Sequence, residues 1–305
     1  GQGKATVEPP YTSLTFPYNH TSIMRSGWDP EHDQTGVFFQ NVERGRTGGL
    51  FRRAKNANSL TVSAFTQHLL VNGTPYAYHY VRSPIQVDGN DQFARAGAMA
   101  MGRKGGNNRG LSRLSTFRYH HSEHFDVTEG VYDGVYAAAP DHEPVLYDYN
   151  TSLMIHEDAI RDVTHRRVVF FVKKSGVWIL LDLMDSEKAY TYKQQWWMSK
   201  LGKKRHDGYE ESQVRAVEAD KAFKSDVEGR VNVSIYHTGP VDLSSGETQS
   251  LSYHPVDTYV MQEEWFKGPR ADRRVGVEHL HLAADWHSSG GTSQLITVVY
   301  PIKPL

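Results

Sequence analysis

Cationic and amide side chains are concentrated in one short segment that precedes an apolar run. The run covers residues 60–71, and the segment before it contains Arg52, Arg53, Lys55, Asn56 and Asn58. In an extended chain alternate side chains point to the same side, so several of these groups would share a face. A guanidinium pairs with a carboxylate or a sulfate through two parallel hydrogen bonds, which predicts a binding site for an acidic polymer. A charged strand end that opposes aggregation would have the same composition.

Tyrosine alternates with other residues shortly after this run. Tyr76, Tyr78 and Tyr80 would lie on one face of a strand and His79 on the other. Tyrosine and histidine can transfer protons during a reaction, so Tyr78, His79 and Tyr80 are candidate acids or bases, and Tyr76 and Arg82 are candidate substrate contacts. An aromatic ladder along a strand edge is the alternative interpretation.

Histidines gather in two further places. His120, His121 and His124 form the densest imidazole cluster, and His279 and His281 have the spacing of one strand face. We expect His120 and His121 to contact substrate. Zinc held by His120 with His124, or by His279 with His281, is the weaker alternative, because either pair needs further ligands.

The elements that position these residues are predicted to be strands. Residues 60–71 indicate a long strand or a hairpin, and residues 164–197 indicate three strands in succession with a shared apolar face of Val168, Phe170, Val172, Trp178 and Leu180. Short strands recur at 231–236, 277–282 and 295–300, separated by glycine and serine. This pattern predicts an all-β fold, a large antiparallel β-sandwich with long loops and few helices.

The domain organisation follows from the same pattern. Residues 1–20, with three prolines, are predicted to be a linker or a first edge strand. Residues 21–305 are predicted to form the sandwich, and a smaller β subdomain from about 200 to 305 is the alternative division. Residues 102–110 are rich in glycine and basic residues and indicate a loop.

Several segments resemble the C-terminal β-sandwich domain of heparinase II/III-like polysaccharide lyases. That domain carries the pattern H-x-H-x-D-x-N-S-F followed by L-Y-A-Y-G-x-x-L-L-V-D-x-G, and Asn58-Ser59-Leu60, Ala64-Phe65 and Leu69-Leu70-Val71-Asn72 fit it without a gap. Four other segments match in the same order, so the likeness covers residues 16 to 198. The resemblance implies a supersandwich-like fold and β-elimination of a uronic-acid polymer, such as a glycosaminoglycan or alginate. It also implies a secreted or periplasmic bacterial location and an upstream helical toroid domain that this chain does not contain.

The chain departs from the family at the positions that carry the chemistry. The family's catalytic histidine corresponds to Arg52, and its usual zinc ligands correspond to Ala54, Asn72 and Arg82. Alanine and arginine do not bind zinc and asparagine binds it poorly, so we expect no metal there and no other cofactor. The chain alone should therefore bind acidic glycan with little or no lyase activity; a non-catalytic carbohydrate-binding or structural module is the alternative.

Composition excludes several other classes. The chain has no cysteine, so disulfides and thiolate metal sites are ruled out. Its 34 lysines and arginines balance 35 aspartates and glutamates, which disfavours nucleic-acid binding by the whole surface. No apolar run is long enough to predict a membrane span. The motifs of serine hydrolases, zinc proteases, kinases and dinucleotide-binding enzymes are also missing.

Overall fold

Short strands with alternating buried and exposed residues make up most of the fold. The computed structural model describes residues 8–17, 21–40, 57–71, 84–92, 118–133, 136–137, 160–199, 208–252 and 275–304. Within these ranges every strand pairing is antiparallel, and the helices are the two short 3-10 turns η2 (Glu211–Gln213) and η3 (Glu218–Asp220). No helix among the described residues is long and apolar enough to cross a membrane.

One layer of the sandwich is an eight-stranded sheet. Its order is β14-β15-β16-β19-β12-β11-β9-β8. The strands are β8 (Arg118–His121), β9 (Phe125–Tyr132), β11 (Thr164–Val172), β12 (Val177–Ser186), β14 (Val214–Val217), β15 (Ala222–Ser225), β16 (Asn232–His237) and β19 (Gly291–Ile302). Strand β19 therefore bonds directly to β12, and β16, β15 and β14 extend the sheet beyond it.

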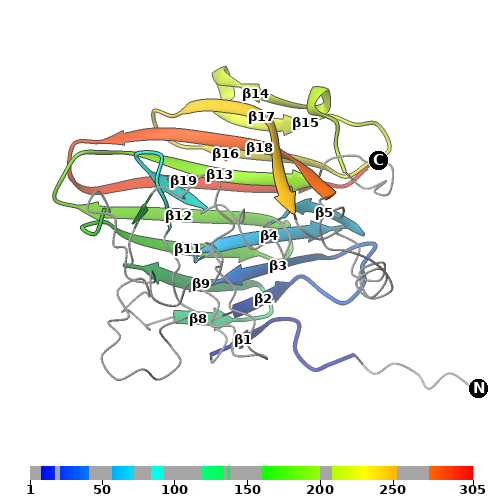
Figure 1. The fold of residues 1–305 in the computed structure, drawn as a ribbon. Coiled ribbons are helices and arrows are strands. Elements are labelled where there is room, and N and C mark those ends of the chain that lie inside the picture. The colour runs from blue at the N-terminus through cyan, green and yellow to red at the C-terminus, as the bar shows by residue number, and fades with distance from the viewer. Residues whose placement is uncertain are drawn as a thin grey trace, which may run out of the picture.

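Two smaller sheets cover the inner face of this layer. The five-stranded sheet consists of β1 (Leu14–Phe16), β2 (Thr21–Arg25), β3 (Gln34–Phe39), β4 (Ser59–Ala64) and β5 (Gln67–Leu70) in chain order, so β1 is an edge strand. The four-stranded sheet has the order β17 (Asp242–Ser252), β18 (Val275–Ser288), β13 (Tyr190–Ser199) and β6 (Ile85–Val87). A small ladder pairs β7 (Asp91–Gln92) with β10 (Tyr136–Ala137). The five-stranded sheet lies over β8, β9 and β11 (Figure 1).

The main core joins all three large sheets. Trp178 of β12 stacks on Phe171 of β11 with ring centroids 3.7 Å apart, and its indole N–H donates to the side-chain oxygen of Gln34 in β3, 2.8 Å away. Met198 of β13 and Leu280 of β18 belong to the same buried cluster. The two smaller sheets are also linked directly, because the backbone N–H of Val71 donates to the carbonyl of Trp197 at 2.9 Å.

The expected all-β sandwich is confirmed, but the predicted apolar face of residues 164–197 is wrong. Phe171, not Phe170, lies opposite Trp178, so Val168 and Phe170 point to the outer face while Trp178 and Leu180 are buried. The third strand of this region, β13, does not continue the sheet of β11 and β12 but pairs with β18 and β6. Because β11 and β12 are apolar on both faces, composition alone did not distinguish the two sides.

Candidate functional site

The cationic segment ends at Asn58, immediately before β4, and the contacts of Asn58 hold the start of that strand in place. Asn58 has a left-handed backbone with φ of 63° and is fully buried. Its backbone N–H donates to the carbonyl of Phe39 at 2.7 Å, and its side-chain amide donates to the carbonyl of His165 at 3.2 Å. The sequence places Asn58 among the substrate-binding residues. In the structure its side chain instead anchors the chain at the point where the segment enters the sheet.

A buried ion pair supports this anchor from beneath. Arg167 of β11 donates from Nε to Asp182 Oδ1 at 2.7 Å and from Nη2 to Asp182 Oδ2 at 2.9 Å. Its remaining Nη1 group donates to the backbone carbonyl of Asn58 at 2.7 Å. The Gln194 amide of β13 donates to Asp182 Oδ2 at 2.7 Å. The pair therefore joins both layers of the sandwich and holds the first residue before β4.

The buried cluster of Arg167, Asp182 and His165 has no net charge. Burial acts to raise the pKa of Asp182, but the Arg167 guanidinium and the His165 hydrogen bond outweigh it and hold that pKa well below its usual range. Burial lowers the pKa of His165, whose Nε2–H donates to Asp182 Oδ1 at 2.7 Å. A neutral His165 leaves one positive and one negative charge, which is the condition under which a buried ion pair is tolerated.

Most of the residues that the sequence singles out lie outside the described residues. These are Arg52, Arg53, Ala54, Lys55, Asn56, Asn72, Tyr76, Tyr78, His79, Tyr80 and Arg82. Their roles therefore stay predictions. The structure shows how the chain is held at Asn58, where the cationic segment ends. It also shows that Val71, the residue before Asn72, bonds to Trp197.

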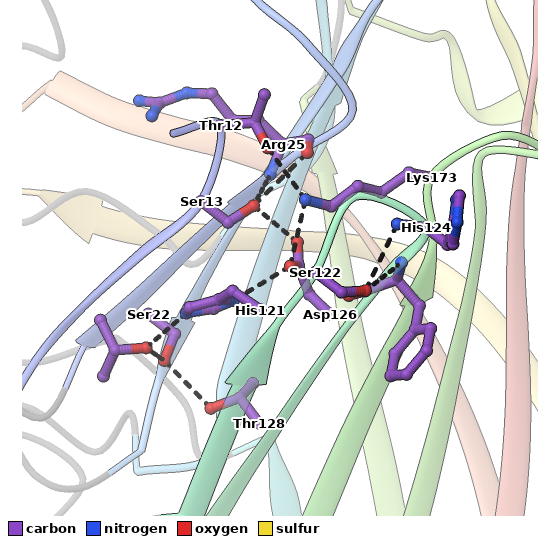
Figure 2. A network of polar contacts seen from close by, with 12 residues as sticks. Thr12, Ser13, Ser22, Arg25, His121, Ser122, His124, Asp126, Thr128 and Lys173 are labelled. Carbon is purple, nitrogen blue, oxygen red and sulfur yellow. Dashed lines mark hydrogen bonds and ion pairs between the residues drawn. The ribbon is translucent and has the colours of Figure 1, made fainter. Parts of the chain in front are cut away.

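His121 belongs to a second polar network, between β1 and β9 (Figure 2). Its Nδ1 lies 3.0 Å from Asp126 Oδ1, and its Nε2 lies 2.8 Å from the hydroxyl of Thr15. Asp126 is fully buried, accepts a hydrogen bond from Ser13 at 2.6 Å, and lies 3.2 Å from the ammonium of Lys173. This network fastens the edge strand β1 to the eight-stranded sheet.

The hydroxyl groups of Thr128, Ser22 and Thr15 form a chain of hydrogen bonds in this network. Gln40 donates to Thr128 at 2.7 Å, the Thr128 and Ser22 oxygens are 3.0 Å apart, and those of Ser22 and Thr15 are 2.8 Å apart. Because the Asp126 carboxylate can only accept, Nδ1 of His121 carries a proton, and in the tautomer protonated at Nδ1 alone Nε2 accepts from Thr15. Each hydroxyl then donates once and accepts once. His121 therefore has a complete set of partners within the protein.

The other predicted histidines are distributed differently. His120 and His124 are exposed on the two sides of the turn after β8. His281 of β18 lies with Nε2 3.0 Å from the side-chain oxygen of Gln195 and with its ring beside Trp197. Among the described residues no group of three or more histidines, aspartates and glutamates is arranged to hold a metal ion. Zinc at either histidine pair stays an untested alternative.

Sequence reasoning missed the charged residues that matter most in the described part. Arg167, Asp182, Asp126 and Lys173 all lie in or beside strands and are buried. The sequence pattern that could have identified them is a charged residue inside an otherwise apolar strand, as in residues 164–172 and 177–186. A lone charge at such a position needs a partner, and the pairing register of β11 and β12, in which Arg167 lies opposite Asp182, supplies it.

Comparisons with known proteins agree on the fold. No protein-family model matches the chain, and no curated protein matches its sequence. Among solved structures, heparan sulfate lyase HepC from Pedobacter heparinus matches with a TM-score of 0.57 and 13% identity over 98% of this chain and 37% of that chain. A heparinase III structure matches with a TM-score of 0.56 and 12% identity over 99% of this chain and 38% of that chain. The chain thus spans little more than a third of these proteins and shares the fold of that part.

Proposed function

We propose that this chain is the β-sandwich part of a heparinase II/III-like polysaccharide lyase and contributes the binding of a uronic-acid polymer. The fold carries the proposal, because almost the whole chain aligns with about 37% of a heparan sulfate lyase. The remaining part of such an enzyme would be a helical toroid that supplies the groups for β-elimination. A secreted or periplasmic location is part of the same proposal.

The cationic segment would be the binding element. Arg52, Arg53 and Lys55 precede Asn58, whose backbone bonds to Phe39 and Arg167 and whose side chain bonds to His165. An anchored strand entry lowers the conformational entropy lost when the segment closes on a ligand. Guanidinium groups suit carboxylate and sulfate because they offer paired donors. A guanidinium stays protonated, so Arg52 would recognise the polymer and not remove its proton.

Binding and salt dependence test this role. The affinity for heparan sulfate and for alginate would be measured at low and moderate salt for the wild type and for the double variant Arg52→Ala/Arg53→Ala. We expect the double variant to bind about tenfold more weakly at low salt, with a smaller difference at higher salt because ions screen exposed charges. Arg215→Ala, which removes an exposed arginine from β14, is the matched control. Equal binding by the wild type and the double variant would contradict the proposal.

Lyase activity separates an enzyme part from a binding module. The unsaturated uronate produced by β-elimination absorbs in the ultraviolet, so product can be followed directly with both polymers. We expect none from this chain alone and product when a helical toroid domain is present on the same polypeptide. The replacement of the family's histidine and zinc positions by Arg52, Ala54 and Asn72 favours a second candidate, a non-catalytic glycan-binding module. Binding without product from the longer polypeptide would support that candidate.

A further inference from the structure

We infer that the outer face of β8, β9 and β11 carries a second binding surface for acidic sugars, separate from the segment at residues 52–56. This inference rests on the proposed function, because it assumes an acidic polysaccharide ligand. The surface, which we name the β8 surface, consists of Arg118, His120, Phe125, Glu129, Arg166 and Phe170. Their strand positions place them on the side of the sheet that faces away from the five-stranded sheet.

The β8 surface has an excess of positive charge. Arg166 lies with Nη1 2.8 Å from Glu129 Oε1, and Arg118 lies with Nε 3.6 Å from Glu129 Oε2. Two guanidinium groups thus share one carboxylate. The side chain of Arg118 is 81% exposed and that of Arg166 is 45% exposed, whereas that of Glu129 is only 10% exposed. A ligand therefore meets the two cations before it meets the anion.

The geometry of Arg118 leaves it able to bind an anion. In the described part of the chain its one ion-pair contact runs through Nε and is longer than a normal hydrogen bond. At 3.6 Å this contact with Glu129 leaves the Arg118 guanidinium without a close ion pair among the described residues. A guanidinium presents Nη pairs in a planar fork that matches a carboxylate or a sulfate. Arg118 can accordingly add such a ligand without breaking a strong existing contact.

Aromatic rings lie next to the two arginines. The His120 and Phe125 ring centroids are 5.5 Å apart, and those of Phe125 and Phe170 are 5.1 Å apart with nearly parallel planes. His120 is exposed, and both phenylalanines are half-exposed. A row of rings provides an apolar surface for the C–H face of a pyranose, while the arginines provide contacts for its acidic group. Rings beside cations are the combination that an acidic sugar requires.

The spacing suits a polymer with repeated charges. Arg118 and Arg166 are on β8 and β11, with β9 between them. Two strand spacings correspond to about 10 Å, so one acidic group of an extended glycan could bind at each arginine. Arginine at a sheet edge also opposes edge-to-edge aggregation, and that role alone would explain Arg118. It would not explain Arg166, which is on an interior strand of the sheet.

Glycan binding by matched variants tests the inference. Titration calorimetry with a heparan sulfate octasaccharide would compare the wild type, Arg118→Ala/Arg166→Ala, Glu129→Gln and the control Arg215→Ala. We expect about tenfold weaker binding for the double variant and about threefold tighter binding for Glu129→Gln, which removes the competing carboxylate. Arg215→Ala should bind like the wild type. Circular dichroism and the melting temperature would identify any variant that is not folded.

The outcomes separate this inference from the proposed function. Loss of binding in Arg52→Ala/Arg53→Ala together with unchanged binding in Arg118→Ala/Arg166→Ala overturns the β8 surface and leaves the proposed function standing. An unchanged affinity in Glu129→Gln also counts against it, since a purely structural carboxylate would not compete with the glycan. If the wild type binds no acidic glycan, the proposed function fails first and the β8 surface fails with it.

Discussion

Arg167 is buried, and its three nitrogen groups all donate to protein oxygens. We expect Arg167→Leu to lower the free energy of unfolding by about 3–5 kcal/mol, because Asp182 would remain buried without its cation. Arg166→Leu, at the next position of the same strand but with a half-exposed side chain, should cost about 1 kcal/mol or less. Urea unfolding of both variants measures the difference. Equal losses would show that the buried pair contributes no more than a surface contact.

His237 gives the fold a pH dependence of known sign. Burial lowers its pKa to about 4, while Nε2 lies 3.0 Å from Gln194 Oε1. An unfolded histidine titrates near pH 6.5, so between about pH 6.5 and about pH 4 the unfolded chain binds a proton that the folded chain does not. The stability that His237 contributes is complete above this window and is lost as the pH falls through it, by up to about 3 kcal/mol.

Substitution isolates this effect from that of the other titrating groups. The free energy of unfolding would be measured at pH 7 and pH 4.5 for the wild type and for His237→Gln. The variant should be less stable at pH 7, where it loses the packing of the ring on Phe223, and should lose less stability on acidification. An identical loss in both proteins would mean that His237 is not the responsible group. His68→Gln is the matched control, because it removes an exposed imidazole that bonds only to the hydroxyl of Ser63 among the described residues.

At the scale of the element, the sequence predicts strands better than it predicts their faces. Residues 60–71 indicate a strand or hairpin, and the structure has the hairpin of β4 and β5, with positive φ at Phe65 and Thr66 in the turn. Val168 and Phe170 are as apolar as Val169 and Phe171, so a period of two is not visible in β11. The pairing with β12 fixes which residues share a face, and the packing of the five-stranded sheet decides which face is buried. The anchor at Asn58 was unpredictable for the same reason, because it depends on contacts more than 100 residues away in sequence.

Gly36 of β3 sets the distance between two layers. A Cβ atom at this position would lie 2.5 Å from Cζ3 of Trp178 and would overlap the adjacent ring atom Cη2. Trp178 cannot move away easily, because it stacks on Phe171 and bonds to Gln34. We expect Gly36→Ala to destabilise the protein by about 1–3 kcal/mol through overpacking. Tryptophan fluorescence and thermal unfolding would report it, and Thr35→Ala, at the neighbouring half-exposed position, should have a smaller effect.

At the scale of the whole molecule, the five-stranded sheet attaches to the eight-stranded sheet through apolar contacts at its centre and through polar contacts at the edge formed by β1 and β8. The centre is packed by Met24, Phe38 and Val62 against Phe171 and Trp178. The edge is joined by Asp126, which contacts Ser13, His121 and Lys173. Strand β1 has only three residue pairs with β2, so the Asp126 network is a large part of what holds it.

Removal of Asp126 should therefore loosen one edge of the molecule before the rest. In Asp126→Ala the ammonium of Lys173, which is almost fully buried, loses its counter-charge, and Ser13 and His121 lose their acceptor. We expect a loss of several kcal/mol, since an unpaired buried charge is costly. Hydrogen exchange should become faster in β1 and β2 and stay slow in β13 and β18, which lie in another sheet. Glu123→Ala removes an exposed acid from the adjacent turn and should change neither. Faster exchange throughout the chain would instead mean that the two layers unfold as one unit.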